Sequence, residues 1–254
     1  MDGANIVMSE LKRAFMHLER VQRICPKHGE YSAVVVRGQM ADFISESVCP
    51  GCSKDDDAAR LAKENAEFVA KQIDLSNIPP KDRRPLSSFP AVGAHVVAVM
   101  QRWITVCAEM NRAEKKGAWI VLQGPTGTGK SGLAFATASE FLKSGRTVRC
   151  YTISELKAHC WSAESRGSNR LAAMKEVSSC DLLVIDDVGS TKMVDSEIEL
   201  VYEVVDDRYK KCKPIIFTTN MTKTQLEALG DRTFSRINHR ATFISCKWKS
   251  LRDD

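Results

Sequence analysis

The sequence Gly124-Pro125-Thr126-Gly127-Thr128-Gly129-Lys130-Ser131 has the residue spacing of a phosphate-binding loop. It follows the apolar run Ala118–Leu122, which predicts a buried strand that leads through the loop into a helix. The glycines let backbone N–H groups approach phosphate, the helix start adds its positive end, and Lys130 adds a point charge. Ser131 offers a hydroxyl ligand to Mg²⁺. The stretch therefore predicts a nucleoside triphosphate site that uses Mg²⁺.

The sequence around this loop alternates helical patterns with short apolar runs, which is typical of a parallel α/β sheet. A long helix is expected over Val92–Lys115, and a second helix follows the loop and ends near Phe141. The later pattern predicts two helices before the acidic run and a basic helix beginning at Gly230. Strands are expected at the run before the loop and at four later places: Thr147–Tyr151, Leu182–Asp187, Pro214–Thr219 and Ala241–Ser245. The fold class is therefore α/β, with a five-stranded parallel sheet.

Polar side chains end two of these predicted strands. Asp186 and Asp187 follow four aliphatic residues, and Asn220 follows Thr219. At the phosphate-bearing edge of the sheet, Asp186 would hold Mg²⁺ and Asp187 would polarise the attacking water. Asn220 would orient that water or sense the γ-phosphate. The alternatives are a helix N-cap for the carboxylates and a turn residue for Asn220.

The amino-terminal part contains a different chemical pattern. Cys25 and His28 form one short pair, Cys49 and Cys52 form another, and twenty residues separate the two pairs. This spacing suits one tetrahedral Zn²⁺ in a closed Cys₃His site without an open catalytic position. The alternative is a set of unrelated reduced cysteines with a surface histidine. Between the pairs, Tyr31–Val36 and Asp42–Ser45 are expected to be short strands, so a small zinc-ribbon-like module is predicted.

Helical patterns flank this zinc-binding module, over Asn5–Gln22 and Ala58–Ile73. Prolines and basic residues in Asp74–Pro90 discourage regular structure and indicate the domain boundary. We therefore expect an amino-terminal module at residues 1–75 and a nucleotide-binding domain at residues 76–254. Without a visible catalytic group, the first module is an interaction module or a purely stabilising appendage.

The composition sets broad limits on the chain. Its 254 residues are 43% hydrophobic, enough for a sizeable core. No run of about 18 apolar residues and no secretory signal pattern occurs, so a soluble, cytoplasmic protein without membrane association is expected. Five of the nine cysteines stand singly in apolar or helical segments, which argues against a disulfide framework. The formal charge of +5 permits a nucleic-acid partner without requiring one.

Taken together, these motifs resemble the AAA+ ATPases, and more narrowly the DnaC-type helicase loaders of bacteria and their phages. The resemblance covers Ser76 to the carboxyl end. It is carried by the phosphate loop, the acidic strand, Thr218–Asn220, Gly230–Arg236 and Lys247–Arg252. It implies an AAA+ P-loop core that binds ATP and has no C-terminal lid domain. Asp187 stands where many relatives have glutamate, and its shorter reach weakens hydrolysis or alters water placement.

The resemblance also implies roles for arginines near the carboxyl end. Arg236 matches the arginine finger that reaches a neighbouring subunit's nucleotide, with Arg232 as the alternative, and Arg252 matches the second sensor acting in cis. A finger in trans requires a ring or spiral homo-oligomer, such as a hexamer on the helicase, so isolated subunits should hydrolyse ATP slowly.

A further implication of the resemblance is a single-stranded DNA site in the helical insertion Thr152–Glu176. Cations would contact the DNA backbone and one aromatic ring would stack on a base. The alternative is an ordinary amphipathic helix pair with the tryptophan in its core. The candidate residues are Lys157, Trp161, Arg166, Arg170 and Lys175.

The favoured function is an ATP-dependent loader that holds a replicative DnaB-type helicase through its amino-terminal module and delivers it onto single-stranded DNA. One alternative is an IstB-like transposition helper, because those ATPases share much of the core. A second is an adaptor that uses nucleotide as an assembly switch with little hydrolysis. A small-molecule kinase is the weakest alternative, since no segment resembles a substrate lid.

Overall fold

The computed structural model describes residues 17–37, 47–109, 119–165, 170–189 and 193–251. The chain divides into two compact units, Met1–Glu67 and Phe68–Asp254. The division falls within helix α2 (Pro50–Leu75). None of the described helices has the length and apolar character needed to cross a bilayer.

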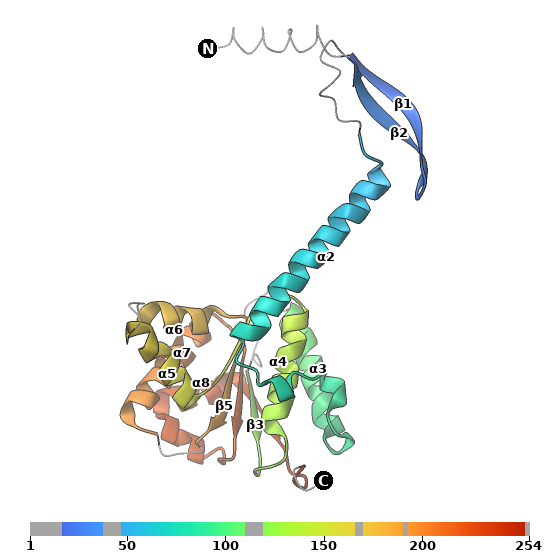
Figure 1. Cartoon of the computed structure of the whole chain (residues 1–254). Helices are drawn as coiled ribbons and strands as arrows, with labels where there is room; N and C mark the ends of the chain where they lie inside the picture. Colours follow the sequence, from blue (N-terminus) through green and yellow to red (C-terminus); the bar gives the residue numbers. More distant parts are fainter. Residues whose placement is uncertain (1–16, 38–46, 110–118, 166–169, 190–192, 252–254) are drawn as a thin grey trace, which may run out of the picture. The chain divides into compact units, whose positions relative to one another are not determined.

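The first unit contains an antiparallel hairpin of β1 (His17–Cys25) and β2 (Gly29–Arg37), shown in blue in Figure 1. The expected strand Tyr31–Val36 is confirmed within β2. The expected helix Asn5–Gln22 is wrong over residues 17–22, which belong to β1. The β-branched run of β2 offers a pairing partner for the whole of β1, and this cross-strand pairing overrides an apolar spacing that also fits a helix. Residues 5–16 and the expected strand Asp42–Ser45 lie outside the described residues.

Helix α2 confirms the helical pattern predicted over Ala58–Ile73 and begins earlier, at Pro50. Proline suits the first helical turn because its ring fixes a helical φ and the first turn needs no N–H donor. The early start places Cys52 in the opening turn of the helix. One pair of predicted zinc ligands is thus held by a helix start and the other by the end of β1.

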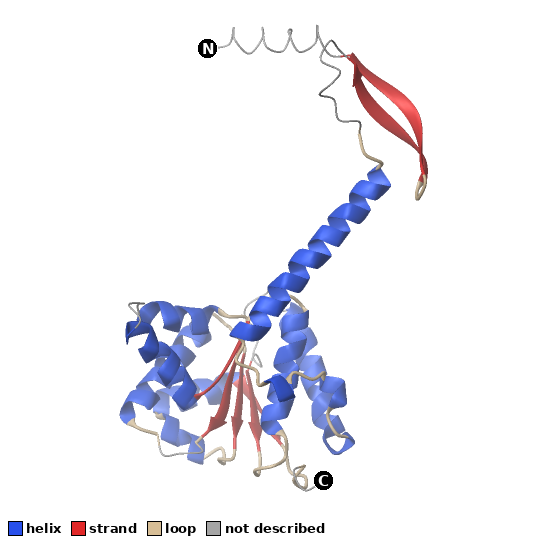
Figure 2. Cartoon of the chain, in the orientation of Figure 1, coloured by secondary structure: helices blue, strands red, loops and turns tan. Residues whose placement is uncertain are grey.

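The second unit is built on a parallel five-stranded sheet with the strand order β4-β5-β6-β3-β7. Figure 2 shows the strands of this sheet pointing in one direction. All carboxyl ends therefore lie at one edge, where ligands bind in sheets of this class. The strands are β3 (Trp119–Gln123), β4 (Val148–Thr152), β5 (Leu182–Val188), β6 (Ile215–Thr219) and β7 (Ala241–Ser245). The predicted α/β class and five parallel strands are confirmed.

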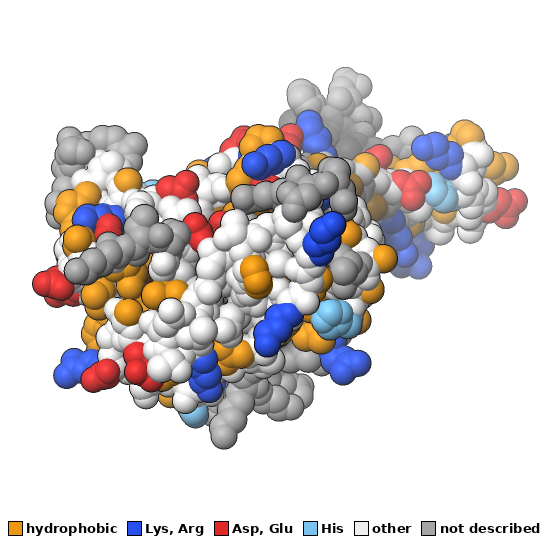
Figure 3. Space-filling view, turned by 90° about the horizontal axis from the view of Figure 1, so that it is seen from below, with side chains coloured by type: hydrophobic (Ala, Val, Ile, Leu, Met, Phe, Trp, Pro, Cys, Tyr) orange, Lys and Arg blue, Asp and Glu red, His pale blue; other side chains and the backbone are white. Residues whose placement is uncertain are grey.

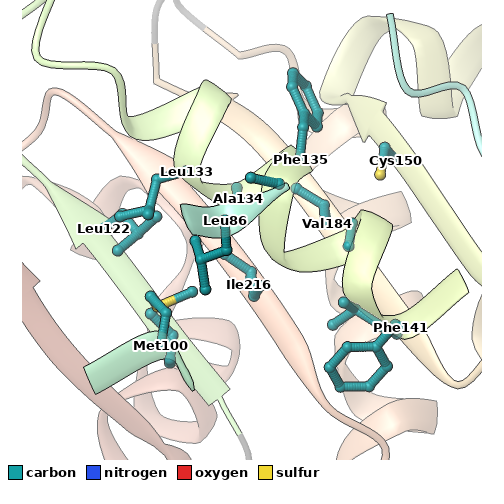
Figure 4. Packing of buried hydrophobic residues seen from close by; sticks show 14 of the residues in the cluster. Leu86, Met100, Leu122, Leu133, Ala134, Phe135, Phe141, Cys150, Val184 and Ile216 are labelled. Atoms are coloured by element: carbon teal, nitrogen blue, oxygen red, sulfur yellow. The ribbon is translucent and has the colours of Figure 1, made fainter. Parts of the chain in front are cut away.

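Helices cover both faces of the sheet. Alternate residues of each strand belong to two separate buried clusters, as the two-residue period of a strand requires. One cluster packs under α3 (Ala94–Glu109) and α4 (Lys130–Lys143), and Figure 4 shows Leu133 and Phe141 of α4 beside Leu122, Val184 and Ile216 of the sheet. The other face is covered by α5 (Ile153–Ser165), α6 (Arg170–Ser179), α7 (Asp195–Lys210) and α8 (Asp231–Arg240).

The segment between α2 and α3 is packed rather than open. It contains three short 3₁₀ turns, Pro80–Asp82, Leu86–Ser88 and Ala91–Gly93. Ile78 and Leu86 are each only 2% exposed and belong to the cluster under α3 and α4. The prolines and basic residues of this segment prevent long helices, but its two apolar residues still fix it to the core.

Candidate nucleotide-binding site

A cavity of about 740 Å³ opens at the carboxyl edge of the sheet. Its walls come from the phosphate loop and the start of α4, from the ends of β5 and β6, and from the segment before α3. Figure 3 views the molecule from this side; in the part of the surface that it colours, Lys and Arg side chains are scattered and form no continuous basic patch. The wall includes Thr126, Gly127, Gly129, Lys130, Ser131, Asp186, Asp187 and Asn220 among the predicted site residues.

The phosphate loop requires glycine at two positions in particular. Gly127 and Gly129 have φ values of 87° and 80°, in the left-handed region that side chains disfavour. A Cβ on Gly127 would lie 2.4 Å from Ser250 Oγ, so a side chain has no room there. Helix α4 starts at the next residue after Gly129. The loop thus delivers the unpaired N–H groups of a helix start to the cavity.

The chain after β7 is hydrogen-bonded to this loop. The Trp248 indole Nε1–H donates to the Thr128 carbonyl at 2.9 Å, and the Leu251 N–H donates to the Gly127 carbonyl at 2.8 Å. The Trp248 ring also contacts Phe89 edge-on, with centroids 6.3 Å apart. Trp248 and Leu251 therefore hold the phosphate loop in place through its carbonyl groups. Arg252 lies beyond the described residues.

The Lys130 ammonium lies inside the site and is only 8% exposed. Its Nζ donates to the carbonyls of Gly124 and Pro125 at 2.8 and 2.7 Å, and to Asn220 Oδ1 at 2.7 Å. The structure therefore brings Asn220 at the end of β6 into direct contact with the phosphate-loop lysine. Both residues line the cavity.

Asp186 at the end of β5 lies beside the start of α4. Burial raises its pKa, and hydrogen bonds from the Thr218 and Ser131 hydroxyls partly oppose that rise. The Thr218 hydroxyl donates to Asp186 Oδ1 at 2.5 Å and accepts the Asp187 N–H at 2.8 Å. A hydroxyl and a carboxylate that face a polar cavity are ligands that Mg²⁺ accepts, so this donor set fits Mg²⁺.

Thr218 is a positioning residue to which the sequence assigned no role of its own. Its polar side chain on a fully buried strand, two residues before Asn220, is the signal that could have identified it. A buried hydroxyl needs a partner, and the neighbouring strand end supplies one.

Asp187 lies at an irregularity in the sheet. The pairing of β5 with β6 shifts register between Ile185 and Val188, and Asp187 has a left-handed φ of 54°. Such bulges re-aim side chains near binding sites, and aspartate tolerates this conformation better than most residues. Asp187 is exposed and lines the cavity, as expected of a group that contacts water beside a phosphate.

The predicted finger residue Arg236 lies on α8 and does not line the cavity. Its Nη2 forms an ion pair with Asp206 of α7, and its guanidinium lies 5.2 and 5.6 Å from the ring centroids of Tyr202 and Tyr209. Hydrogen bonds and ion pairs with Lys210 and Arg236 lower the pKa of Asp206. Arg232 is exposed, one turn earlier on the same helix.

The predicted DNA-binding residues lie on α5 and α6. Trp161 is 36% exposed, so the alternative that places it in a core is wrong. Lys157 Nζ and the Arg170 guanidinium lie 5.9 and 4.9 Å from its ring centroid. These cations also pair with carboxylates of α7, Glu197 at 3.6 Å and Glu203 at 3.0 Å respectively.

The other two predicted DNA-binding residues are Arg166 and Lys175. Lys175 of α6 is exposed, and Arg166 lies outside the described residues. The structure therefore gathers Lys157, Trp161 and Arg170, with their charges partly balanced by α7.

The four predicted zinc ligands meet in the first unit. The ligand atoms of Cys25, His28, Cys49 and Cys52 all lie within 4.8 Å of one another. His28 Nδ1 lies 3.7, 3.7 and 3.5 Å from the three sulfur atoms of Cys25, Cys49 and Cys52. A Zn–S bond of about 2.3 Å gives tetrahedral edges of about 3.8 Å, so the arrangement fits one Zn²⁺.

The surroundings of the cluster support the same chemistry. The backbone N–H groups of Lys27 and His28 lower the pKa of Cys25 to about 6, whereas a hydrogen bond with Cys25 raises the pKa of Cys52 to about 11. His28 Nε2 lies 3.2 Å from Asp55 Oδ2, so a carboxylate orients the histidine from behind. A Cβ on Gly51 would lie 2.5 Å from the His28 ring, and glycine leaves space for that ring.

Comparison with known proteins gives consistent matches. The family model described as IstB-like ATP binding protein matches residues 65–254. The chain is 23% identical over 239 residues to the uncharacterized protein YdaV of Escherichia coli K12, covering 92% of each. It is 27% identical over 138 residues to the replicative helicase loader DnaC of the same organism, covering 53% of this chain and 56% of that protein.

A solved structure extends this similarity to the fold. The crystal structure of the DnaC helicase loader matches with a TM-score of 0.53 at 20% sequence identity, covering 63% of this chain and 95% of that chain. At this identity the match concerns the fold, which is that of the AAA+ P-loop proteins. The predicted AAA+ fold is confirmed.

Proposed function

Because this chain belongs to the IstB-like ATP-binding family and has a DnaC-like AAA+ fold, we propose that it is an ATP-dependent loader of a replicative DNA helicase. The observation that carries the proposal is the assembly of Lys130, Asn220, Ser131 and Asp186 at one cavity, in a chain whose AAA+ unit is similar to DnaC. The loader would hold a DnaB-type helicase and place it on single-stranded DNA.

ATP hydrolysis would use residues already in place. Lys130 and the N–H groups at the start of α4 bind phosphate, and Asn220 positions the lysine. Ser131 and Asp186 would hold Mg²⁺, which neutralises charge on the phosphate oxygens when bound. Thr218 orients Asp186, and Asp187 accepts a hydrogen bond from the attacking water. Asp186 and Asn220 lie at the carboxyl ends of the adjacent strands β5 and β6, so a single nucleotide can contact both residues.

The position of Arg236 supports the proposed oligomer. Since this arginine lies outside its own chain's cavity, it could serve a nucleotide only in a neighbouring subunit. Release from Asp206 would be needed before it reached a γ-phosphate. Arg232 is the alternative finger, and Arg252 the proposed second sensor in cis.

Single-stranded DNA is the proposed nucleic-acid partner. Support comes from the partly exposed Trp161 ring between Lys157 and Arg170, which offers one stacking surface and two cations. Arg166 and Lys175 complete the proposed site. The α7 carboxylates Glu197 and Glu203 compete with phosphate for these cations, so DNA binding should be weak unless those ion pairs open.

The amino-terminal module, residues 1–75, is proposed to bind Zn²⁺ and to dock the helicase. A hairpin of two strands is marginal on its own in water, and metal ligation supplies the missing stability. The family match begins at residue 65, so most of this module lies outside the matched ATP-binding region and could carry a separate contact such as helicase docking.

One observation favours a second function. The matching family is named for an insertion-sequence protein, and the chain is 27% identical over 139 residues to an IS21 putative ATP-binding protein of Pseudomonas aeruginosa. A transposition helper that uses the same ATP site is therefore the alternative. A second alternative is an adaptor that uses nucleotide as a switch and hydrolyses little of it. It is kept because the Asp187 side chain is shorter than the glutamate of many relatives and reaches less far toward the attacking water.

The test is capture of the host's DnaB-type helicase by the full-length protein, in ATP and in ADP. The matched variant is Cys49→Ser with Cys52→Ser, which removes one pair of zinc ligands and leaves the ATP site unchanged. A loader should capture helicase as wild type and lose it in this variant. Absence of helicase in every arm, together with intact ATP binding, would favour the transposition helper.

A further inference from the structure

The segment between α2 and α3 forms one wall of the nucleotide cavity, a role that its linker-like composition does not suggest. Lys81, Asp82 and Arg84 all line the cavity together with Ser131 and Asp186. Lys81 and Asp82 also line a smaller cavity of about 280 Å³ beside it, next to Ser131 and Tyr151. This wall therefore lies at the phosphate-binding end of α4.

Two buried side chains hold this wall in place. Ile78 precedes the charged residues and Leu86 follows them, and both are 2% exposed within the core. Arg83 Nε donates to the Ile78 carbonyl at 3.0 Å, which closes the turn between them. Its neighbours Lys81 and Arg84 are thus presented from a fixed segment rather than from a free loop.

Arg84 lies close to the first turn of α4. Its Nη2 is 3.4 Å from the position that a Cβ on Gly132 would occupy, and Asp82 Oδ1 is 4.0 Å from the same point. Gly132 is the third residue of α4, so its N–H belongs to the first turn, whose donors have no partner within the helix. A phosphate bound by those N–H groups would lie beside the guanidinium.

The Arg84 guanidinium is available for a phosphate because it has no carboxylate partner among the described residues. Arg84 is exposed and, among the residues that the structure describes, forms no ion pair. In contrast, Arg236, Arg170 and Arg149 are each paired with a carboxylate. An arginine held at a helix start without a carboxylate partner is well suited to a phosphate, which its planar fork contacts through two hydrogen bonds.

We propose that Arg84 is a nucleotide-binding residue that contacts the phosphate chain of ATP or ADP in cis. This inference rests on the proposed nucleotide site and adds to it a cation outside the phosphate loop. Arg84 would neutralise phosphate charge beside the first turn of α4. Lys81 lines the same cavity and adds a second positive charge to it.

The experiment compares full-length wild type with Arg84→Gln, Arg84→Lys and Lys130→Ala in titrations with fluorescent ATP and ADP analogues. The matched control is Arg102→Gln, which removes an exposed arginine of α3 that does not line the cavity. We expect Arg84→Gln to weaken both analogues by roughly tenfold to a hundredfold, as loss of a charge-assisted hydrogen bond does. Arg84→Lys should recover part of that loss, and Arg102→Gln should match wild type.

The melting temperature of the nucleotide-free protein separates binding from folding. Arg84→Gln should leave it unchanged, because the side chain is exposed and forms no ion pair with the described part of the chain. Affinity within twofold of wild type in Arg84→Gln, or a loss equalled by a drop in nucleotide-free melting temperature, would overturn the inference. If wild type and Lys130→Ala both fail to bind, the nucleotide site itself is wrong. If Lys130→Ala fails to bind while Arg84→Gln binds as tightly as wild type, the site stands and the Arg84 inference alone is overturned.

Discussion

Arg208 of α7 has a guanidinium that is fully buried and binds backbone carbonyls instead of a carboxylate. Its Nη1 donates to the carbonyls of Val177, Ser178 and Cys180, and its Nη2 donates to the Pro214 carbonyl at 2.6 Å. The first of these carbonyls belong to the end of α6, which has no further helical donors of its own. One side chain therefore joins the end of α6 to the start of β6, and burial lowers the pKa of its guanidinium.

We expect Arg208→Met to destabilise the second unit by about 3 kcal/mol, because several buried carbonyls would lose their donor. Urea unfolding followed by circular dichroism measures this. Arg102→Met, at an exposed position on α3, is the control and should change stability by less than about 0.5 kcal/mol. Equal stability of the two variants would show that water replaces the guanidinium.

At the scale of elements, the sequence predicted the residues that line the nucleotide site better than the residues that position them. The strand ends that hold Asp186 and Asn220 were predictable because apolar runs followed by polar residues have a simple meaning in a parallel sheet. Thr218 and Arg84 were not predicted, because their roles depend on a neighbouring strand and on a helix start about fifty residues away. Strand β1 was mistaken for a helix because its pairing with β2 cannot be read from its own apolar spacing.

Helix α8 allows a test of the finger. Arg236→Ala should leave ATP affinity unchanged and reduce hydrolysis tenfold or more, only at concentrations where the protein assembles, since a finger acts on a neighbouring nucleotide. Arg232→Ala is the paired variant on the same helix. Steady-state phosphate release against protein concentration is the measurement. Equal loss of binding and turnover in Arg236→Ala would indicate a role in cis or in folding through Asp206.

The hairpin and the start of α2 allow a test of the metal. Removal of Zn²⁺ with a chelator should unfold the β1–β2 hairpin, because two short strands alone are marginal, and should leave ATP binding intact. Nuclear magnetic resonance of the Cys25 and Cys49 neighbourhoods, with elemental analysis of the metal, measures this. Much less than one zinc per chain in the purified protein would contradict the site.

At the scale of the whole molecule, nucleotide occupancy should control assembly. Lys130→Ala removes the ammonium that contacts Asn220 and the loop carbonyls, so we expect it to abolish ATP-dependent oligomers. Light scattering after size separation, in ATP and in ADP, measures the change. Oligomers of unchanged size in the variant would show that assembly does not depend on the phosphate loop. Lys143→Ala, at the other end of α4, is the control and should assemble like wild type.

The hydrogen bond from the Trp248 indole to the Thr128 carbonyl makes the site optically visible. Of the other tryptophans, Trp103 and Trp119 are buried in the core and Trp161 lies on α5, whereas Trp248 donates a hydrogen bond to the phosphate loop. Movement of that loop around a phosphate chain would change the polarity at one indole and hence the ultraviolet emission of the unlabelled protein. Trp248→Phe should remove the ATP-dependent part of that emission, so the binding steps could be timed in a stopped-flow instrument without a dye.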